Sequence, residues 1–424
     1  STLKRTLFPY TTLFRSCAEK ACGETMSTLE IADIFRAGFE SYVRAACALP
    51  MEHYKVAHAI MACRTEELGG HVYQCDSCGH ERTLYNSCGN RHCPKCQALA
   101  RVQWVQARIE ELLPVPYFHA VFTLPVEINP FLLRNKTAGY SLLFRSVRET
   151  LSELSADNKL LGARTGFILV LHSWGQNLMD HPHIHCIIPG GGLDSQASVW
   201  KKSRKRFLFP VAVMSALFKG KFMHGFRQAV RDKSIGLHGL LNKYDDPGEF
   251  QQLVNGVYDK RWVVYAKQPF AGPEAVVRYL GNYTHRIAIS NHRILAFENN
   301  RVTFSWRDYA DHNKKKEMTL ATHEFIRRFL LHVVPNGFMR IRHYGILGNR
   351  CKAKLLPMCR KLIEGAAVTA ADPVEKRVEK KKAWHEVILE MTGADPRICP
   401  FCKKGMMVIV GDIPEKKRQW LSWP

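Results

Sequence analysis

The stretch HPHIHCIIPGGG, residues 181–192, predicts a buried strand that ends in a glycine turn. Side chains at positions i and i+2 of a strand point to the same side. His183 and His185 therefore face one way, while Ile184 between them enters the core. Two convergent imidazoles form half of a divalent-metal site, although an isolated His-x-His pair is more often structural.

A third ligand has to come from another segment. The apolar strand TGFILVLHSW, residues 165–174, carries His172 near its end, and we expect this histidine to complete the site. His181 and Gln176 are the alternatives.

The segments around these two strands indicate the fold class. FHAVFTLP (118–125) and WVVYAKQ (262–268) predict further strands, and KTAGYSLLFRSVRETLSEL (136–154) predicts a helix. RILAFENNRVTFSWRD (293–308) predicts a hairpin around Asn299 and Asn300. Strands and helices interleaved in this way favour an α+β domain built on a largely antiparallel sheet with helical insertions.

Two tyrosines lie about a hundred residues after the histidines. The segment PEAVVRYLGNYTHR (273–286) predicts a helix that begins at Pro273. Tyr279 and Tyr283 are four residues apart, so both phenols would lie on one face of that helix. A Tyr-x-x-x-Tyr pair alone is more often structural, and only its combination with the histidine motif favours a functional role.

The cysteines are concentrated in CDSCGHERTLYNSCGNRHCPKCQ, residues 75–97. The pairs Cys75/Cys78 and Cys93/Cys96 have the spacing with which two knuckles hold one zinc ion. Four thiolates leave no open coordination position, so we expect this zinc to be structural. Cys88 and His92 lie between the pairs and could replace one thiolate or serve a second ion.

A further Cys-x-x-Cys pair, Cys399 and Cys402, stands near the end of the chain. One pair needs two more ligands, which Cys351, Cys359 or His343 could supply if the fold brings them near. A second zinc site is therefore a hypothesis at this point.

Composition restricts the class of partner. The formal net charge is +23 and the sequence pI is near 9.5, which favours a polyanionic partner such as nucleic acid. No stretch approaches the roughly 18 to 20 apolar residues of a membrane-spanning helix. The Cys-x-x-Cys pairs among the fourteen cysteines indicate metal binding in a reducing cytosol rather than a secreted disulfide scaffold.

The chain divides into four predicted segments. Residues 1–25 read as a non-native or disordered leader, with Met26 as a suitable start, and residues 26–115 as the zinc-binding domain. Residues 116–350 form the α+β domain, and residues 351–424 a charged, helical, basic tail with a possible second knuckle.

The ordered motifs NSCGNRHCPKCQ, HPHIHCIIPGGG and RYLGNYTHRIAISNHRI resemble the HUH transposases of rolling-circle insertion sequences. The resemblance extends from about residue 28 to about residue 350. It implies a zinc-binding domain ahead of an antiparallel-sheet nuclease, in a cytoplasmic, DNA-associated bacterial protein. It also implies His183 and His185 as ligands of a divalent metal and Tyr279 and Tyr283 as nucleophiles.

The chemistry implied by the resemblance is cleavage and rejoining of single-stranded or hairpin DNA at element ends. A tyrosine attacks the phosphate and forms a 5′-phosphotyrosine, with magnesium or manganese as the expected ion. Two other classes would share part of the motif set: a rolling-circle replication initiator, and a zinc-dependent DNA-binding regulator without enzymatic activity.

Overall fold

The structure is a computed structural model of the chain. It describes residues 29–46, 48–204, 208–267, 275, 281, 288–308, 311–365, 383, 385, 386, 388, 389 and 393–416.

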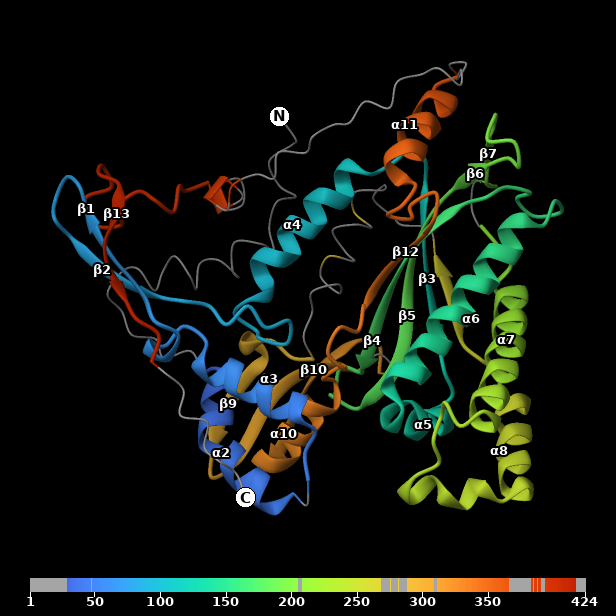
Figure 1. Cartoon of the computed structure of the whole chain (residues 1–424), viewed down its shortest axis with the longest axis horizontal. Coiled ribbons are helices and arrows are strands. Elements are labelled where there is room, and N and C mark those ends of the chain that lie inside the picture. The colour runs from blue at the N-terminus through green and yellow to red at the C-terminus, as the bar shows by residue number, and fades with distance from the viewer. Residues whose placement is uncertain are drawn as a thin grey trace.

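A five-stranded antiparallel sheet forms the centre of the molecule (Figure 1). Strand β5 is its middle strand, β4 and β3 flank it, and β12 and β8 form the edges. This arrangement confirms the predicted α+β class. The bounds of the strands, in sheet order, are β12 (Ile341–Gly345), β4 (Gly166–Trp174), β5 (Asp180–Pro189), β3 (Tyr117–Thr123) and β8 (Val264–Lys267).

One face of this sheet is covered by helices. Phe122, Leu169 and Ile184 point from three adjacent strands into a core that they share with these helices. Because side chains alternate along a strand, His183 and His185 lie on the opposite face, which is the side of helix α4 (Gln97–Glu110) in Figure 1. The covering helices are α5 (Asn129–Arg134), α6 (Lys136–Ala156), α7 (Val211–Arg231) and α8 (Pro247–Asp259).

A second antiparallel sheet packs with N-terminal helices. The predicted hairpin is confirmed, with Asn299 and Asn300 at its turn, both at positive φ as a type I′ turn requires. Phe304 of this sheet shares one core with Phe35 of the N-terminal region. The elements are β9 (Ile294–Glu298), β10 (Arg301–Asp308), β11 (Lys314–Ala321), α10 (Thr322–Leu331), α2 (Ile31–Ala45) and α3 (Met51–Ala62).

A third sheet joins the two ends of the described chain. Its middle strand β1 (Gly70–Cys75) pairs on one side with β2 (Glu81–Tyr85) and on the other with β13 (Met407–Ile413). Strand β13, from the segment expected to form a tail, thus completes a sheet of the N-terminal region.

The remaining elements are short or peripheral. Helix α11 (Lys352–Ile363) packs over the histidine-bearing face of the central sheet, where Leu356 shares a core with Val170 and Ile187. Within the described residues, no helix combines the length and the apolar character needed to cross a membrane. The other elements are β6 (Gly191–Leu193), β7 (Trp200–Lys202) and the 3-10 helices η2 (Glu66–Leu68), η3 (Val126–Ile128), η4 (Gly239–Asp245) and η5 (Asn291–Arg293).

Candidate metal centres

Three histidines from two adjacent strands converge on one face of the central sheet. His172 of β4 stands directly opposite His183 of β5 in the strand register, and His185 follows on the same side of β5. One ring nitrogen from each of the three lies within 4.8 Å of the others. His172 and His185 are buried, and His183 is partly buried. The structure thus brings together the three histidines that the sequence singled out.

The two alternative ligands, His181 and Gln176, make other contacts through their backbone oxygens. The side chain of His181 is exposed, and its backbone oxygen accepts a hydrogen bond from the Nδ1 atom of His183 at 2.6 Å. The backbone oxygen of Gln176 accepts a hydrogen bond from Arg293 at 2.6 Å. His181 is not a member of the histidine cluster.

Hydrogen bonding determines which nitrogen of His183 faces the cluster. A carbonyl oxygen can only accept, so Nδ1 of His183 carries the proton and Nε2 presents a lone pair. Burial lowers the pKa of His183 to about 4, which keeps its imidazole neutral at pH 7. Its Nε2 lies 3.1 Å from Nε2 of His185. Two nitrogens that bind one divalent ion at about 2.1 Å each would be about 3.0 to 3.4 Å apart, so these residues fit a metal ion.

A fourth histidine supports the cluster. Nε2 of His119 on β3 lies 2.9 Å from Nδ1 of His185, and the two rings are nearly parallel. Burial lowers the pKa of His119 to about 4, so a neutral His119 can accept the Nδ1 proton of His185. The sequence analysis missed this residue. The sequence shows that His119 alternates with the apolar residues of a predicted strand. It does not show the strand register that places His119 beside His185.

The tyrosines expected to act with this cluster, Tyr279 and Tyr283, lie outside the described residues. Gly281, which stands between them in the sequence, is described, and it is buried against α4. A Cβ atom at Gly281 would lie 2.0 Å from Cγ2 of Val105, so any larger residue would collide with that helix.

One group of four cysteines lies at the base of the β1–β2 hairpin. Cys93 and Cys96 meet Cys63, which follows α3, and Cys88, which follows β2. The Sγ atom of Cys96 is 3.5 Å from that of Cys63 and 3.5 Å from that of Cys88. Cys88 is thus a member of the group.

His92 lies near this cysteine group but does not belong to it. The side chain of His92 is buried, and burial lowers its pKa well below the ordinary value.

The expected single site of Cys75, Cys78, Cys93 and Cys96 is corrected by this arrangement. Cys75 and Cys78 lie instead with Cys399 and Cys402, in a second cluster. The reason is geometric: Cys75 ends strand β1, whose six residues extend about 20 Å. The first pair is therefore carried to the tip of the hairpin, away from Cys93 and Cys96 at its base.

The residues considered as partners of Cys399 and Cys402 lie elsewhere. The thiol of Cys351 lies 3.2 Å from the backbone oxygen of Gly345. Cys359 of α11 is buried in an apolar core, and His343 lies on β12. None of the three belongs to the second cysteine cluster.

Comparison with known proteins identifies the family. Residues 34–124 match a family model described as a transposase zinc-binding domain, and residues 166–354 match one described as "Putative transposase". The chain is 45% identical over 381 residues to "Putative transposase y4qJ" of Sinorhizobium fredii, which covers 90% of this chain and 94% of the relative. The chain belongs to the IS91 family of transposases.

A second relative supports this assignment. The transposase for insertion sequence element IS801 of Pseudomonas savastanoi pv. phaseolicola is 28% identical over 332 residues, 75% of each chain. No solved structure matches the chain. Membership of a transposase family implies a DNA endonuclease and strand transferase, with DNA as the substrate.

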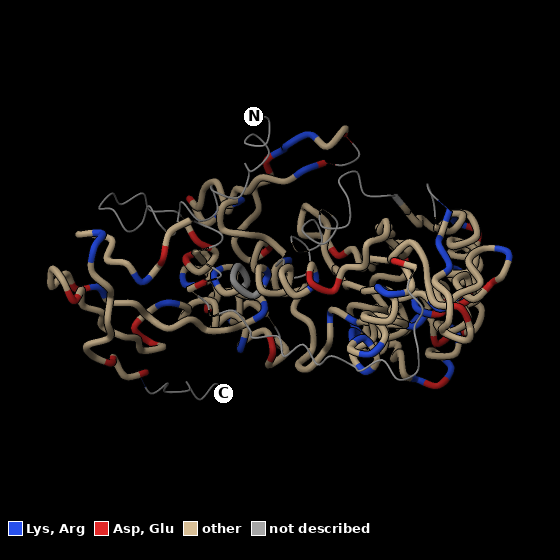
Figure 2. The backbone as a smooth tube through the Cα atoms, turned by 90° about the horizontal axis from the view of Figure 1, so that it is seen from above, with Lys and Arg blue, Asp and Glu red and all other residues tan. Residues whose placement is uncertain are grey.

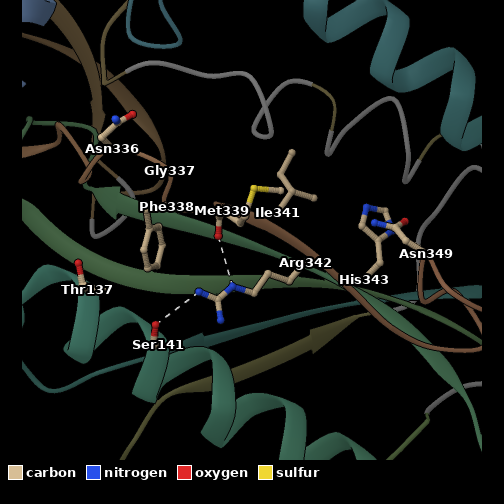
Figure 3. Close-up of a pocket in the computed structure, with 10 residues that line it drawn as sticks. All are labelled: Thr137, Ser141, Asn336, Gly337, Phe338, Met339, Ile341, Arg342, His343 and Asn349. Carbon is tan, nitrogen blue, oxygen red and sulfur yellow. Dashed lines mark hydrogen bonds between the residues drawn. The ribbon is translucent and has the colours of Figure 1, made fainter.

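The transposase has a cavity of about 580 Å³ beside edge strand β12 (Figure 3). Its lining includes Ser141 of α6 and Arg342 of β12, and none of the three clustered histidines. The guanidinium of Arg342 donates to the backbone oxygen of Met339 and to the Ser141 hydroxyl, and it stacks over the ring of Phe144. The guanidinium of Arg342 is thus engaged in intramolecular contacts at the wall of this cavity.

Basic residues occur along the whole length of the described backbone of the transposase. Figure 2 shows Lys and Arg over the whole length of the molecule, with acidic residues among them. Trp262 is only 3% exposed and packs in the helical core, so it offers no stacking surface for a base. Charge alone therefore does not locate the DNA path.

Proposed function

We propose that this transposase nicks and rejoins single-stranded DNA through a 5′-phosphotyrosine intermediate and thereby moves an insertion sequence by rolling-circle transposition. The observation that carries the proposal is the cluster of His172, His183 and His185, whose ring nitrogens converge on the face of the sheet opposite the helical core. DNA that is unpaired or folded as a hairpin at the element ends is the proposed substrate.

The three histidines would hold a divalent ion, which we propose to be magnesium or manganese. Such an ion, when bound, polarises the scissile phosphate and stabilises negative charge on the leaving oxygen. Three protein ligands leave positions open for phosphate oxygens. His183 contributes through Nε2, because its Nδ1 proton is engaged by the backbone oxygen of residue 181.

Tyr279 and Tyr283 are the proposed nucleophiles. The phenolic oxygen of one attacks phosphorus and gives up its proton, the bond from phosphorus to the 3′ oxygen breaks, and that oxygen takes up a proton to leave a free 3′ hydroxyl. The reverse attack by a 3′ hydroxyl on the phosphotyrosine rejoins a strand without a nucleotide cofactor. A second tyrosine allows a second cleavage before the first end is released.

The cluster of Cys63, Cys88, Cys93 and Cys96 is proposed to hold a structural zinc ion. Four thiolates at these separations close a tetrahedral site. Arg91, inside the same segment, donates to the backbone oxygens of Phe338 and Pro335 at 2.6 Å, just before β12. This zinc would therefore position the N-terminal region against the edge of the nuclease sheet.

The decisive experiment is covalent capture of a single-stranded oligonucleotide that carries an element end. Tyr279→Phe with Tyr283→Phe should abolish the covalent adduct, because phenylalanine has no nucleophilic oxygen. The matched control is Tyr258→Phe, which removes an exposed hydroxyl on α8 and should leave capture intact. An adduct that persists in the double variant would refute the proposal.

The metal part of the proposal needs its own variants. His183→Ala and His185→Ala should each lose metal-dependent cleavage while the melting temperature stays near that of the unmodified chain. His181→Ala is the control, since it removes an exposed ring and keeps the backbone oxygen that orients His183. Cleavage that continues in the His185 variant at the same metal concentration would exclude this cluster as the metal site.

A further inference from the structure

The four cysteines at the tip of the β1–β2 hairpin come from opposite ends of the chain. The Sγ atom of Cys75 is 3.6 Å from that of Cys402, and the Sγ atom of Cys78 is 3.8 Å from that of Cys399. Disulfide-bonded sulfurs are about 2.05 Å apart, so these pairs are too far apart to be bonded to each other. Two thiolates on one tetrahedral zinc at about 2.3 Å lie about 3.8 Å apart, which matches both separations.

The two Cys-x-x-Cys turns have the same backbone form. In each, the residue four positions after the first cysteine donates to the backbone oxygen of that cysteine: Gly79 to Cys75 at 3.0 Å, and Lys403 to Cys399 at 3.0 Å. Both donors have positive φ. Two separate segments of the chain thus form equivalent knuckles that face one another.

Backbone N–H groups also point at the sulfurs. The N–H of Ser77 lies 3.4 Å from Sγ of Cys75, and the N–H of Gly405 lies 3.4 Å from Sγ of Cys402. Such donors stabilise thiolates, the form in which cysteine binds a metal. Each turn thus supplies at least one backbone donor to a sulfur of its own knuckle.

The two knuckles fit closely together. A Cβ atom at Gly405 would lie 2.5 Å from Sγ of Cys75, so only glycine allows this approach. Asp76 and Met406 exchange two hydrogen bonds, of 3.1 Å through the Met406 oxygen and 2.8 Å through the Asp76 carboxylate.

The sheet that carries the knuckles has little apolar burial of its own. Val408, Ile409 and Val410 of β13 are all exposed, and so is Phe401 beside the knuckle. A small sheet with a thin core generally requires a metal or a covalent link for stability. The cluster of Cys75, Cys78, Cys399 and Cys402 lies between the β1–β2 hairpin and the segment that leads into β13, so a metal ion there would link the two.

We infer that Cys75, Cys78, Cys399 and Cys402 bind a second structural zinc ion, which holds the C-terminal segment of the transposase to its N-terminal hairpin. The zinc-binding domain match ends at residue 124 and the transposase match at residue 354, so neither includes Cys399 or Cys402. All four ligands are thiolates, so the site is closed and plays no part in cleavage. The inference does not depend on the proposed nuclease function.

Zinc content of the purified full-length protein tests this inference. Native mass spectrometry and metal analysis should find two zinc ions per chain, and Cys399→Ser with Cys402→Ser should retain one. The matched control is Cys351→Ser, which changes a cysteine outside both clusters and should retain two. A double variant that keeps as much zinc as the unmodified chain would overturn the inference.

Limited proteolysis gives an independent readout. Loss of the second zinc should make the segment around β13 cleavable while the central sheet stays resistant, because β13 belongs to the small sheet. If the double variant does not fold, replacement of zinc by cobalt in the unmodified chain still decides the question. Two tetrathiolate sites should give twice the cobalt absorbance per chain of one site, and the absorbance of one site alone would refute the second.

Discussion

One histidine that is not itself a proposed metal ligand orients the ring of His185. His119 stands on β3 with Nε2 at 2.9 Å from Nδ1 of His185, whose Nε2 faces His183. A partner on the second ring nitrogen selects the tautomer and holds the ring, so His119 is a positioning residue for the proposed metal site.

We predict that His119→Ala raises the manganese concentration for half-maximal oligonucleotide cleavage by about 10 to 100-fold, the usual cost of losing such a partner. The rate at saturating manganese should change much less. His119→Gln, which can still accept a hydrogen bond, should recover part of the effect. His224→Ala on the exposed side of α7 is the control. If His119→Ala lowers the stability but leaves the manganese concentration for half-maximal cleavage unchanged, His119 contributes only to packing.

At the level of elements, helix α10 is hydrogen-bonded to the turn between β4 and β5, the strands that carry His172 and His183. Arg328 of α10 donates to the backbone oxygen of Asn177 at 3.1 Å, and Arg293 donates to that of Gln176. Glu324 accepts from both Arg327 and Arg328 at 2.6 Å, and these partners lower the pKa of its carboxyl group to about 2. The second sheet and its helix thus support the connection on which the spacing of His172 and His183 depends.

This ion-pair network predicts a pH-dependent stability. A carboxyl group whose pKa is lower in the folded state stabilises the fold above its ordinary pKa of 4.5, and that contribution is lost as the pH falls toward 2. Glu324→Gln should therefore lower the free energy of unfolding by about 0.5 to 1 kcal/mol at pH 7, since partly exposed ion pairs contribute little. The difference should shrink to about half by pH 3. Urea unfolding at both pH values measures it, and an equal loss at both would contradict the assignment.

At the level of the whole molecule, the chain carries a large surplus of positive charge. The net charge of the chain is +23, and Lys and Arg occur along the whole length of the described backbone (Figure 2). Such a surplus attracts DNA, because each neutralised phosphate releases condensed counterions.

Binding of single-stranded DNA should consequently weaken steeply with salt. If about six phosphates are contacted, affinity should fall about 300-fold between about 50 and about 200 mM salt. Fluorescence anisotropy with the Tyr279→Phe/Tyr283→Phe variant measures binding without cleavage. An affinity that hardly responds to salt would argue against a backbone-dominated interface.

Local sequence patterns were sufficient for several features of this transposase. Alternation along residues 181–192 placed His183 and His185 on one side of a strand and Ile184 in the core, and the Asn299–Asn300 turn specified its hairpin. These features depend on spacing within one element, where the period of a strand or the conformation of a turn determines the outcome. The tyrosine pair was found by the same reasoning and stays a prediction.

Tertiary structure alone decided which distant residues meet. The spacing of Cys75, Cys78, Cys93 and Cys96 suggested one zinc site, yet a hairpin strand carries the first pair to Cys399 and Cys402, while Cys63 and Cys88 join the second. His119 reaches His185 only through the register of β3 against β5. Sequence spacing determines the form of a knuckle or a strand face, but the partner across a sheet depends on strand pairing, which local spacing does not encode.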